Sequence, residues 1–359
     1  MNNLNELTII IPTYNRQNYV IRNINFWSNK EPQVIILDGS LNPIQEDVII
    51  NFGENINYIH LPLSFSERLG FVSDLITTKY SVLLGDDDLF LTSGLSKCIE
   101  ILSKNENINC CLGRSLSFSY IKSDVYYDIC YSEMRNYSII DESPYDRVIN
   151  HMSNYTCSTL YAVNRSHYFK KILKNLSKEN FEDANLVELF IEMSNAYLGK
   201  SIIIPDIMWF RSIENDTLYD KSISTYQNIW LNSKKKEKLI STLNLIFNEY
   251  NPNFETNKMV AIGLENYFSL EKNNSFTKRR YIFNPSLIIK LVAFYKFKVK
   301  NLYKLKTLKE TFDFTILKQK KLDHVLYTLK NDIVKYNFTE IKELEQFIHK
   351  FYLFTYGRI

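Results

Sequence analysis

The chain has 359 residues, of which 45% are hydrophobic and 23% are charged, and this balance is typical of a globular protein with a sizeable core. Nine glycines are too few for a glycine-rich phosphate-binding loop or a low-complexity linker. Five cysteines without a Cys-x-x-Cys spacing argue against a zinc site and for a reducing compartment. The polar N-terminus and the lack of an apolar stretch of ~20 residues predict a cytoplasmic protein without signal peptide or membrane span.

The net charge of +3 hides an asymmetry between two parts of the chain. Residues 1–230 carry 19 Lys and Arg against 28 Asp and Glu, a balance of −9. Residues 231–359 carry 24 against 12, a balance of +12. A difference of this size predicts two domains with different partners, with the boundary near residue 230 and a basic, mainly helical second domain.

Strands and helices alternate over the first quarter of the chain. Apolar and β-branched runs predict strands at 7–11, 33–37, 57–60 and 80–84, and helical spacing predicts helices at 16–28, 44–51 and 65–77. Such alternation is typical of a parallel sheet with right-handed crossovers. The expected fold is therefore α/β, with a Rossmann-like, mostly parallel sheet flanked by helices.

Three of these strands end in polar residues. Pro12-Thr13-Tyr14-Asn15 follows the first strand, Asp38-Gly39-Ser40 the second, and Gly85-Asp86-Asp87-Asp88 the fourth. The carboxyl ends of parallel strands share one edge of the sheet, where α/β folds bind ligands. We therefore expect the three segments to form a single site.

The run of three aspartates predicts a cation site. Adjacent carboxylates repel one another and cannot enter the core unpaired. A hard divalent ion with oxygen ligands, Mg²⁺ or Mn²⁺, is the natural counter-charge. The alternative is a solvated turn in which Asp88 caps the helix expected to begin near Thr92.

Together, the segments Ile9–Arg16, Leu37–Ser40 and Leu84–Asp88 resemble the family 2 glycosyltransferases of the GT-A fold. That family has I-P-x-Y-N at its first strand, D-x-S at its second and an Asp-x-Asp motif at its fourth, and the match covers about the first 90 residues. The resemblance implies a donor-binding set of Pro12, Thr13, Tyr14, Asn15, Asp38, Asp86 and Asp87. It also implies that Asp86 contacts the donor's ribose or sugar and that Asp88 holds the metal bridging the donor diphosphate, with Asp86 as the second candidate ligand of that metal.

The resemblance has one departure and one further candidate. Family members commonly have an Arg-Asn pair in the helix before the fourth strand, whereas Ser73-Asp74 lies in that region here. How the donor sugar is held is therefore open. The family often has a basic residue that faces the diphosphate after its last core strand, and Arg211 is the candidate for that role.

Further elements are expected beyond residue 90. The pattern predicts helices at 92–103 and 143–152, strands at 109–120, 125–131, 156–163 and 201–204, and a turn at Pro205-Asp206. His151 has no second metal ligand at i+4 and is expected to be structural.

Asp183 is the candidate catalytic base. It is a good N-cap for the helix expected up to about Leu198, which is its structural interpretation. Family 2 enzymes have a Glu-Asp pair at this point, and the resemblance implies that Asp183 takes the proton of the acceptor hydroxyl in an inverting transfer. Glu188 and Glu182 are the alternative bases.

The basic second domain suggests a surface for lipid. Residues 278–321 contain thirteen Lys and Arg and only two acidic residues. A basic helix with aromatic residues is typical of binding to an anionic membrane, here the inner face of the cell membrane. A solvated helical bundle explains the same pattern, and no motif supports binding to nucleic acid.

These features predict a metal-dependent, inverting, hexosyltransferase-type glycosyltransferase with a helical C-terminal appendage. It would move a sugar from a nucleotide-sugar donor, preferably a UDP-sugar, to a growing cell-surface glycan or a lipid-linked saccharide, as in polysaccharide biosynthesis. A sugar nucleotidyltransferase is one alternative, but it needs a Gly-rich, basic first loop. The other is an inactive glycan- or membrane-binding module, against which the intact cluster of aspartates argues.

Overall fold

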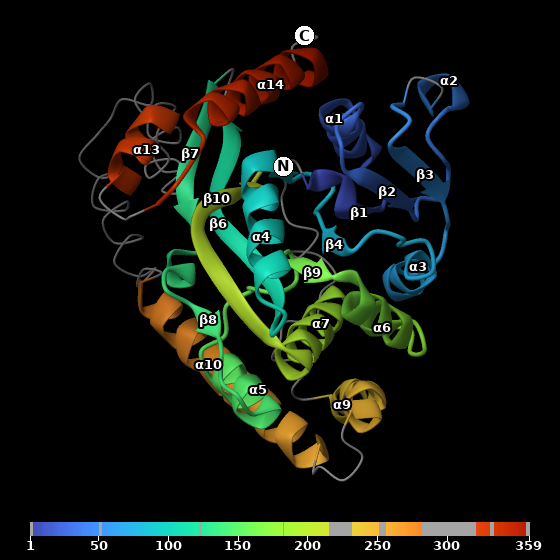
Figure 1. The fold of residues 1–359 in the computed structure, drawn as a ribbon, viewed down its shortest axis with the longest axis vertical. Coiled ribbons are helices and arrows are strands. Elements are labelled where there is room, and N and C mark those ends of the chain that lie inside the picture. The colour runs from blue at the N-terminus through green and yellow to red at the C-terminus, as the bar shows by residue number, and fades with distance from the viewer. Residues whose placement is uncertain are drawn as a thin grey trace, which may run out of the picture.

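One mixed sheet of ten strands runs through the part of the chain that the computed structural model describes (Figure 1). The described residues are 3–49, 52–121, 124–181, 183–214, 232–250, 256–281, 321–330 and 334–356. The strand order along the sheet is β3-β2-β1-β4-β9-β6-β10-β5, with β7 beside β6 and β8 beside β10. The predicted α/β architecture is confirmed.

The first half of the sheet is parallel. Its strands are β1 (Leu7–Thr13), β2 (Gln33–Asp38), β3 (Ile56–His60) and β4 (Tyr80–Leu83). Their connections are α1 (Gln17–Trp27), α2 (Glu46–Ile49) and α3 (Phe65–Val72). β1, β2 and β4 are buried almost throughout, because helices cover both faces of a parallel sheet.

The second half of the sheet mixes parallel and antiparallel pairs. Its strands are β5 (Leu89–Phe90), β6 (Ile108–Ile121), β7 (Asp124–Cys130), β8 (Ser138–Ile139), β9 (Val163–Arg165) and β10 (Lys200–Ser212). The long strands β6 and β10 run parallel, and β6 and β7 form the antiparallel pair that the sequence predicts. Helix α4 (Thr92–Lys104) lies across β6 and β10 (Figure 1).

Two sequence-based expectations are wrong in this half. The strand expected at 156–163 is reduced to the start of β9, because the backbone N–H groups of Thr159 and Leu160 donate to the buried Glu192 carboxylate at 2.9 and 2.8 Å. The turn expected at Pro205-Asp206 is an irregularity within β10, where the register against β6 shifts between Ile203 and Ile207.

A second layer of helices covers the lower part of the sheet in Figure 1. Its members are α5 (Pro144–Ser153), α6 (Ser166–Leu176), α7 (Ala184–Leu198), α9 (Ser233–Tyr250) and α10 (Thr256–Tyr281). Met152, Phe190, Phe247 and Tyr267, from α5, α7, α9 and α10, are buried in one hydrophobic cluster. Helices α9 and α10 therefore share a core with helices of the first 230 residues.

The last two helices, α13 (Leu322–Lys330) and α14 (Phe338–Tyr356), also pack on the first part of the chain. Ile341, Leu344 and Ile348 of α14 lie in the same hydrophobic cluster as Trp27 of α1. The domain boundary expected at residue 230 falls outside the described residues and stays a prediction. The basic stretch at 278–321 also lies outside them, apart from its two ends.

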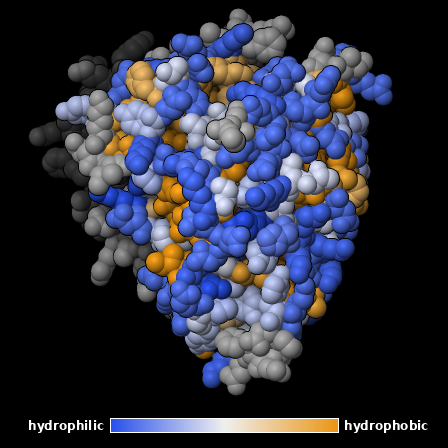
Figure 2. All heavy atoms as spheres, viewed as in Figure 1, coloured by the Kyte–Doolittle hydropathy of each residue, from blue (hydrophilic) through white to orange (hydrophobic). Residues whose placement is uncertain are grey.

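No helix among the described residues is long and apolar enough to cross a membrane. On the face drawn in Figure 2, hydrophobic residues lie in small groups between hydrophilic ones.

A contact between distant parts of the chain caps helix α4. The residue before this helix, Leu91, has no side chain that can accept a hydrogen bond. Glu340 of α14 takes its place: its Oε1 accepts from the Thr92 N–H at 2.5 Å and from the Thr92 hydroxyl at 2.6 Å. A carboxylate at a helix N-terminus also interacts favourably with the helix dipole.

We expect Glu340→Ala to lower the free energy of unfolding by about 1–2 kcal/mol, because the backbone N–H groups of Thr92 and Ser93 lose their acceptor. Urea unfolding followed by circular dichroism measures this change. Glu343→Ala removes an exposed carboxylate from the same helix and should change stability by no more than about 0.5 kcal/mol. Equal effects of the two substitutions would contradict the assignment of the cap.

Candidate active site

The polar ends of β1, β2 and β4 lie together at the carboxyl edge of the sheet. Thr13, the last residue of β1, pairs in register with Asp38, the last residue of β2. The Thr13 hydroxyl donates to Oδ2 of Asp86 at 2.8 Å, which joins the first strand to the loop after the fourth. The structure therefore brings together the three segments that the sequence marks as one site.

Asp86 and Asp87 share a cation. Nη1 of Arg16 lies 3.1 Å from Oδ1 of Asp86, and its Nη2 lies 2.5 Å from Oδ2 of Asp87. Asp86 is buried, and burial raises its pKa to about 7, against the opposing effect of the Arg16 charge. The sequence motif did not single out Arg16, although it directly follows Asn15.

The C-terminal end of strand β10 binds the Asp88 side chain. Its Oδ2 accepts from the indole N–H of Trp209 and its Oδ1 from the backbone N–H of Ser212, both at 2.8 Å. Burial, followed by the charge of Asp87, raises the pKa of Asp88 well above its usual range. The bond to Trp209 spans 121 residues of sequence, so no local pattern predicts it.

Helix α1 holds the backbone of the aspartate loop. The Asn23 amide donates to the carbonyl oxygens of Asp86 at 2.8 Å and Asp88 at 3.0 Å. Nη2 of Arg22 donates to the carbonyl oxygen of Asp87, and its Nη1 pairs with Glu214 at 2.8 Å. Sequence reasoning missed both residues. Their only signal in the sequence is that they are polar and fall on the apolar face of the expected helix.

Asp38 is buried and accepts three hydrogen bonds. Its Oδ1 accepts from the Ser40 N–H at 2.8 Å, and its Oδ2 accepts from the Tyr58 hydroxyl at 2.7 Å and the Gln17 amide at 3.0 Å. Burial alone would raise the pKa of Asp38, but these donors outweigh it and lower the pKa below its usual value. Asp38 is therefore a fixed carboxylate beneath the loop surface.

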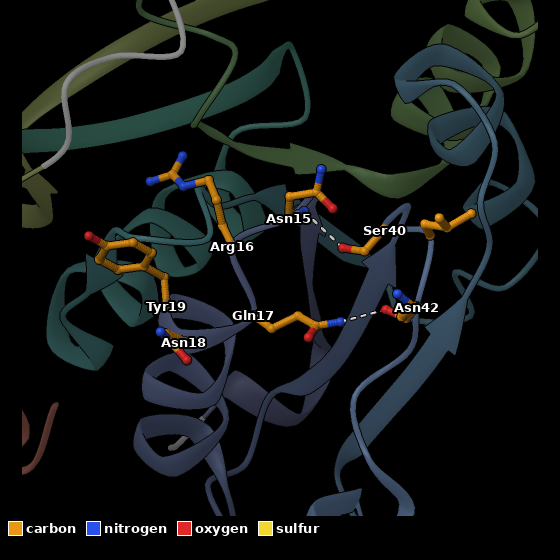
Figure 3. Close-up of a pocket in the computed structure, with 8 residues that line it drawn as sticks. Asn15, Arg16, Gln17, Asn18, Tyr19, Ser40 and Asn42 are labelled. Carbon is orange, nitrogen blue, oxygen red and sulfur yellow. Dashed lines mark hydrogen bonds between the residues drawn. The ribbon is translucent and has the colours of Figure 1, made fainter.

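A cavity of about 560 Å³ opens beside these loops (Figure 3). Its lining consists of Asn15, Arg16, Gln17, Asn18, Tyr19, Ser40, Leu41 and Asn42. Asn15 adopts a left-handed backbone with φ 55°, which asparagine tolerates, and its N–H donates to the Ser40 hydroxyl. Asn15 is the predicted donor-binding residue in this lining, and Arg16 connects the cavity to the aspartates.

The remaining residues of the predicted donor set are not among the residues that line this cavity. Pro12 and Thr13 end strand β1, and Tyr14 directly precedes the cavity residue Asn15 with 53% of its surface exposed. An exposed aromatic ring can stack on a nucleotide base.

Helix α3, which precedes strand β4, contains an arginine, Arg68. Helix α3 ends at Val72, so Ser73-Asp74 follow it, and sequence reasoning therefore looked too far along the chain. Nη1 of Arg68 donates to the carbonyl oxygens of Thr13 at 2.6 Å and Leu37 at 2.7 Å, beneath the ends of β1 and β2. A Cβ atom on Gly39 would lie 2.5 Å from Cζ of Arg68, so the absence of a side chain at Gly39 makes room for the guanidinium.

The candidate bases occupy different surroundings. Asp183 accepts from the N–H of Asn185 at 3.1 Å as the N-cap of α7, and it pairs with Lys235 at 3.0 Å. Glu188, one turn further along α7, accepts a hydrogen bond from the Tyr155 hydroxyl. Glu182 lies outside the described residues.

Arg211 and His151 complete the sequence candidates. The Arg211 guanidinium is half-buried at 5.2 Å from the Tyr131 ring centroid. His151 is buried, with Nε2 at 3.0 Å from Glu192 and Nδ1 at 2.5 Å from the Tyr137 hydroxyl, as expected for a structural histidine.

The aspartates fit a divalent cation that is shared with a substrate. Asp86 and Asp88 offer carboxylate oxygens as ligands, and burial is the largest cause of their raised pKa values, so a cation would stabilise their charged forms. Within the described residues, no three His, Cys, Asp or Glu side chains converge on one point. Mg²⁺ commonly binds through one or two carboxylates together with substrate phosphates, which agrees with a donor set of two.

We expect Asn23→Ala to lower the free energy of unfolding by about 2 kcal/mol or more, because two buried carbonyl oxygens lose their donor. Chemical denaturation measures this loss. Asn25→Ala removes an amide from the exposed face of the same helix and should be within about 0.5 kcal/mol of the parent. A stable Asn23→Ala protein would mean that the loop does not depend on the Asn23 amide.

The chain was compared with family models, with solved structures and with curated proteins. Residues 8–180 match the model of the family described as Glycosyl transferase family 2. A crystal structure of S. aureus TarS 1-349 in complex with UDP-GlcNAc is 14% identical in sequence to the chain. The match covers 75% of this chain and 74% of the TarS chain, with a TM-score of 0.52. A second crystal structure of TarS 1-349 is 12% identical in sequence. That match covers 76% of this chain and 91% of the TarS chain, with a TM-score of 0.43. None of the curated proteins matches the chain.

Proposed function

Residues 8–180 of this chain belong to glycosyl transferase family 2, and from that premise we propose a metal-dependent, inverting transfer from a UDP-sugar. The observation that carries the proposal is the pair of buried carboxylates, Asp86 and Asp88, at the end of strand β4 beside a polar cavity. This carboxylate pair repels a diphosphate unless a cation lies between them.

The donor is proposed from the cavity and from one neighbour. The TarS structure with the TM-score of 0.52 contains UDP-GlcNAc, which favours a UDP-sugar here. Tyr14 would stack on the base, and Asn15 and Ser40 in the cavity would offer polar groups to the ribose. Asp38 would keep this loop in shape, since its carboxylate accepts bonds from Ser40 and Gln17.

The transfer itself needs few groups. Asp86 and Asp88 would hold Mn²⁺ or Mg²⁺, which when bound stabilises the charge on the leaving diphosphate. The acceptor oxygen forms its bond to the anomeric carbon from the side opposite the diphosphate, whose bond to that carbon breaks. Asp183 takes the proton of the acceptor hydroxyl. Arg211 would face the diphosphate.

The acceptor is proposed to be a growing cell-surface glycan or a lipid-linked saccharide. The basic residues 278–321 support this proposal, because a polybasic segment attracts an anionic membrane where such acceptors lie. The rival function is an inactive glycan- or membrane-binding module on the same fold, and it predicts no transfer.

Metal-dependent nucleotide binding tests the proposal. We expect UDP with Mn²⁺ to raise the melting temperature, whereas UDP alone does not, and we expect GDP, CDP and dTDP to be weaker. A ligand at a hundredfold excess over its Kd stabilises a protein by about 2.7 kcal/mol, which a thermal-shift assay resolves.

In the same assay, we expect Asp88→Asn to lose this metal-dependent stabilisation, because the substitution removes a charge at nearly constant size. Asp47→Asn, on the exposed surface of α2, is the control and should behave as the parent. Equal stabilisation of the Asp88→Asn protein would show that Asp88 does not hold the metal.

The base is tested by comparing Asp183→Asn with Glu188→Gln. Asparagine caps helices about as well as aspartate, so the Asp183→Asn protein should fold and bind UDP with Mn²⁺. We expect its transfer rate to fall by about 10²–10⁴-fold, because it cannot accept a proton. Release of UDP from UDP-GlcNAc in the presence of acceptor measures the rate.

A different pattern would reassign the base. If Asp183→Asn transfers within about threefold of the parent while Glu188→Gln loses the activity, Glu188 is the base. If Asp183→Asn unfolds, the residue acts as a helix cap and in its ion pair with Lys235.

A further inference from the structure

Tyr131 has a left-handed backbone conformation, which is unusual for a tyrosine. The described non-glycine residues with positive φ are Asn15, Asn29, Tyr131 and Asn136, with φ between 53° and 61°. Asparagine is among the residues that tolerate the left-handed region, and a bulky side chain there is an outlier. Tyr131, with φ 53° and ψ 61°, is the exception among these four. Such strain persists where the surroundings require it, and it is frequent at functional sites.

The ring of Tyr131 contacts the tryptophan that binds Asp88. Tyr131 stacks on Trp209 with ring centroids 5.4 Å apart and an angle of 17° between the planes. Tyr161 also packs against Trp209, at 4.6 Å and 35°. The indole of Trp209 is buried between its neighbours, and its N–H donates to Oδ2 of Asp88 at 2.8 Å.

Tyr131 also contacts the next side chain on the same face of strand β10. Cζ of Arg211 lies 5.2 Å from the Tyr131 ring centroid, and alternate residues of a strand point to the same side. The following residue, Ser212, donates its backbone N–H to Oδ1 of Asp88. The Tyr131 ring therefore contacts both Trp209, which binds Asp88, and Arg211, which directly precedes the second donor to Asp88.

We propose that Tyr131 is a positioning residue for the donor site: its ring fixes the plane of Trp209 and thereby the orientation of the Asp88 carboxylate. This inference rests on the proposed function, in which Asp88 holds the metal of the donor. Glycine or asparagine at position 131 would adopt this backbone with less strain, and an asparagine does occupy the other left-handed position nearby, Asn136. Neither residue type has a ring that could stack on Trp209. The strained tyrosine is kept because the contact needs an aromatic side chain.

The test compares Tyr131→Phe, which keeps the ring, with Tyr131→Asn, which keeps the turn and removes the ring. Protein labelled with 5-fluorotryptophan should give signals for Trp27, Trp209 and Trp230, and loss of one signal in Trp209→Phe assigns it. In the ligand-free protein, we expect the Trp209 signal to move in Tyr131→Asn and to stay in place in Tyr131→Phe. Asn136→Gly, in the same turn, should leave it unchanged.

Calorimetry with UDP and Mn²⁺ measures the consequence for the site. We expect Tyr131→Asn to bind about 10–100-fold more weakly, the usual effect of losing a group that orients a metal ligand, and Tyr131→Phe to bind as the parent does. A parent that does not bind UDP with Mn²⁺ would refute the proposed function itself. A parent that binds, together with a folded Tyr131→Asn that binds equally well, would overturn only the role of Tyr131.

A variant that cannot fold also decides the question. If Tyr131→Asn is unfolded, Tyr131→Leu keeps an apolar side chain without a ring and takes its place in both measurements. Normal binding by Tyr131→Leu, or unfolding of both variants, would show that Tyr131 only fills the core and would overturn the proposal.

Discussion

The structure depends on keeping two buried carboxylates, Asp86 and Asp88, at the end of the fully buried strand β4. A charge that leaves water must find donors or a cation, and otherwise it takes up a proton. Thr13, Arg16, Trp209 and the Ser212 N–H supply the donors for these two side chains. Burial is the largest influence on both carboxyl groups and raises their pKa values despite these partners, so a further cation would stabilise their charged forms.

The donors come from segments that are far apart in sequence. Helix α1 holds the carbonyl oxygens of the loop through Arg22 and Asn23, and strand β10 holds the Asp88 side chain. Helix α14 packs on α1 and caps α4 through Glu340, so even the C-terminal helices support the region around the site. The site therefore requires a large part of the fold, although its motifs occupy only the first quarter of the chain.

The sequence predicted those parts of the site that follow from strand order. Three strands with polar ends had to meet at one edge, and the contact between Thr13 and Asp86 agrees with that expectation. The α/β architecture followed from the alternation of periodic segments. The N-cap role of Asp183 was also predictable, because it depends on residues next to it in sequence.

The remaining features depend on contacts that no local pattern contains. Arg22 and Asn23 bind backbone carbonyls, which carry no side-chain signal, and Trp209 lies 121 residues from Asp88. The strand expected at 156–163 failed because the Glu192 carboxylate takes the backbone donors that a strand would use. Arg68 was overlooked because helix α3 ends earlier than its apolar spacing suggests.

The central claim is that the edge formed by β1, β2 and β4 binds a nucleotide diphosphate through a metal at Asp86 and Asp88. A crystal structure of the protein with UDP and Mn²⁺ tests it most directly. The account predicts Mn²⁺ between the diphosphate and Asp88, with uridine beside Tyr14 and in the cavity of Asn15 and Ser40. Nucleotide bound elsewhere, or a diphosphate held at this edge without metal, would contradict it.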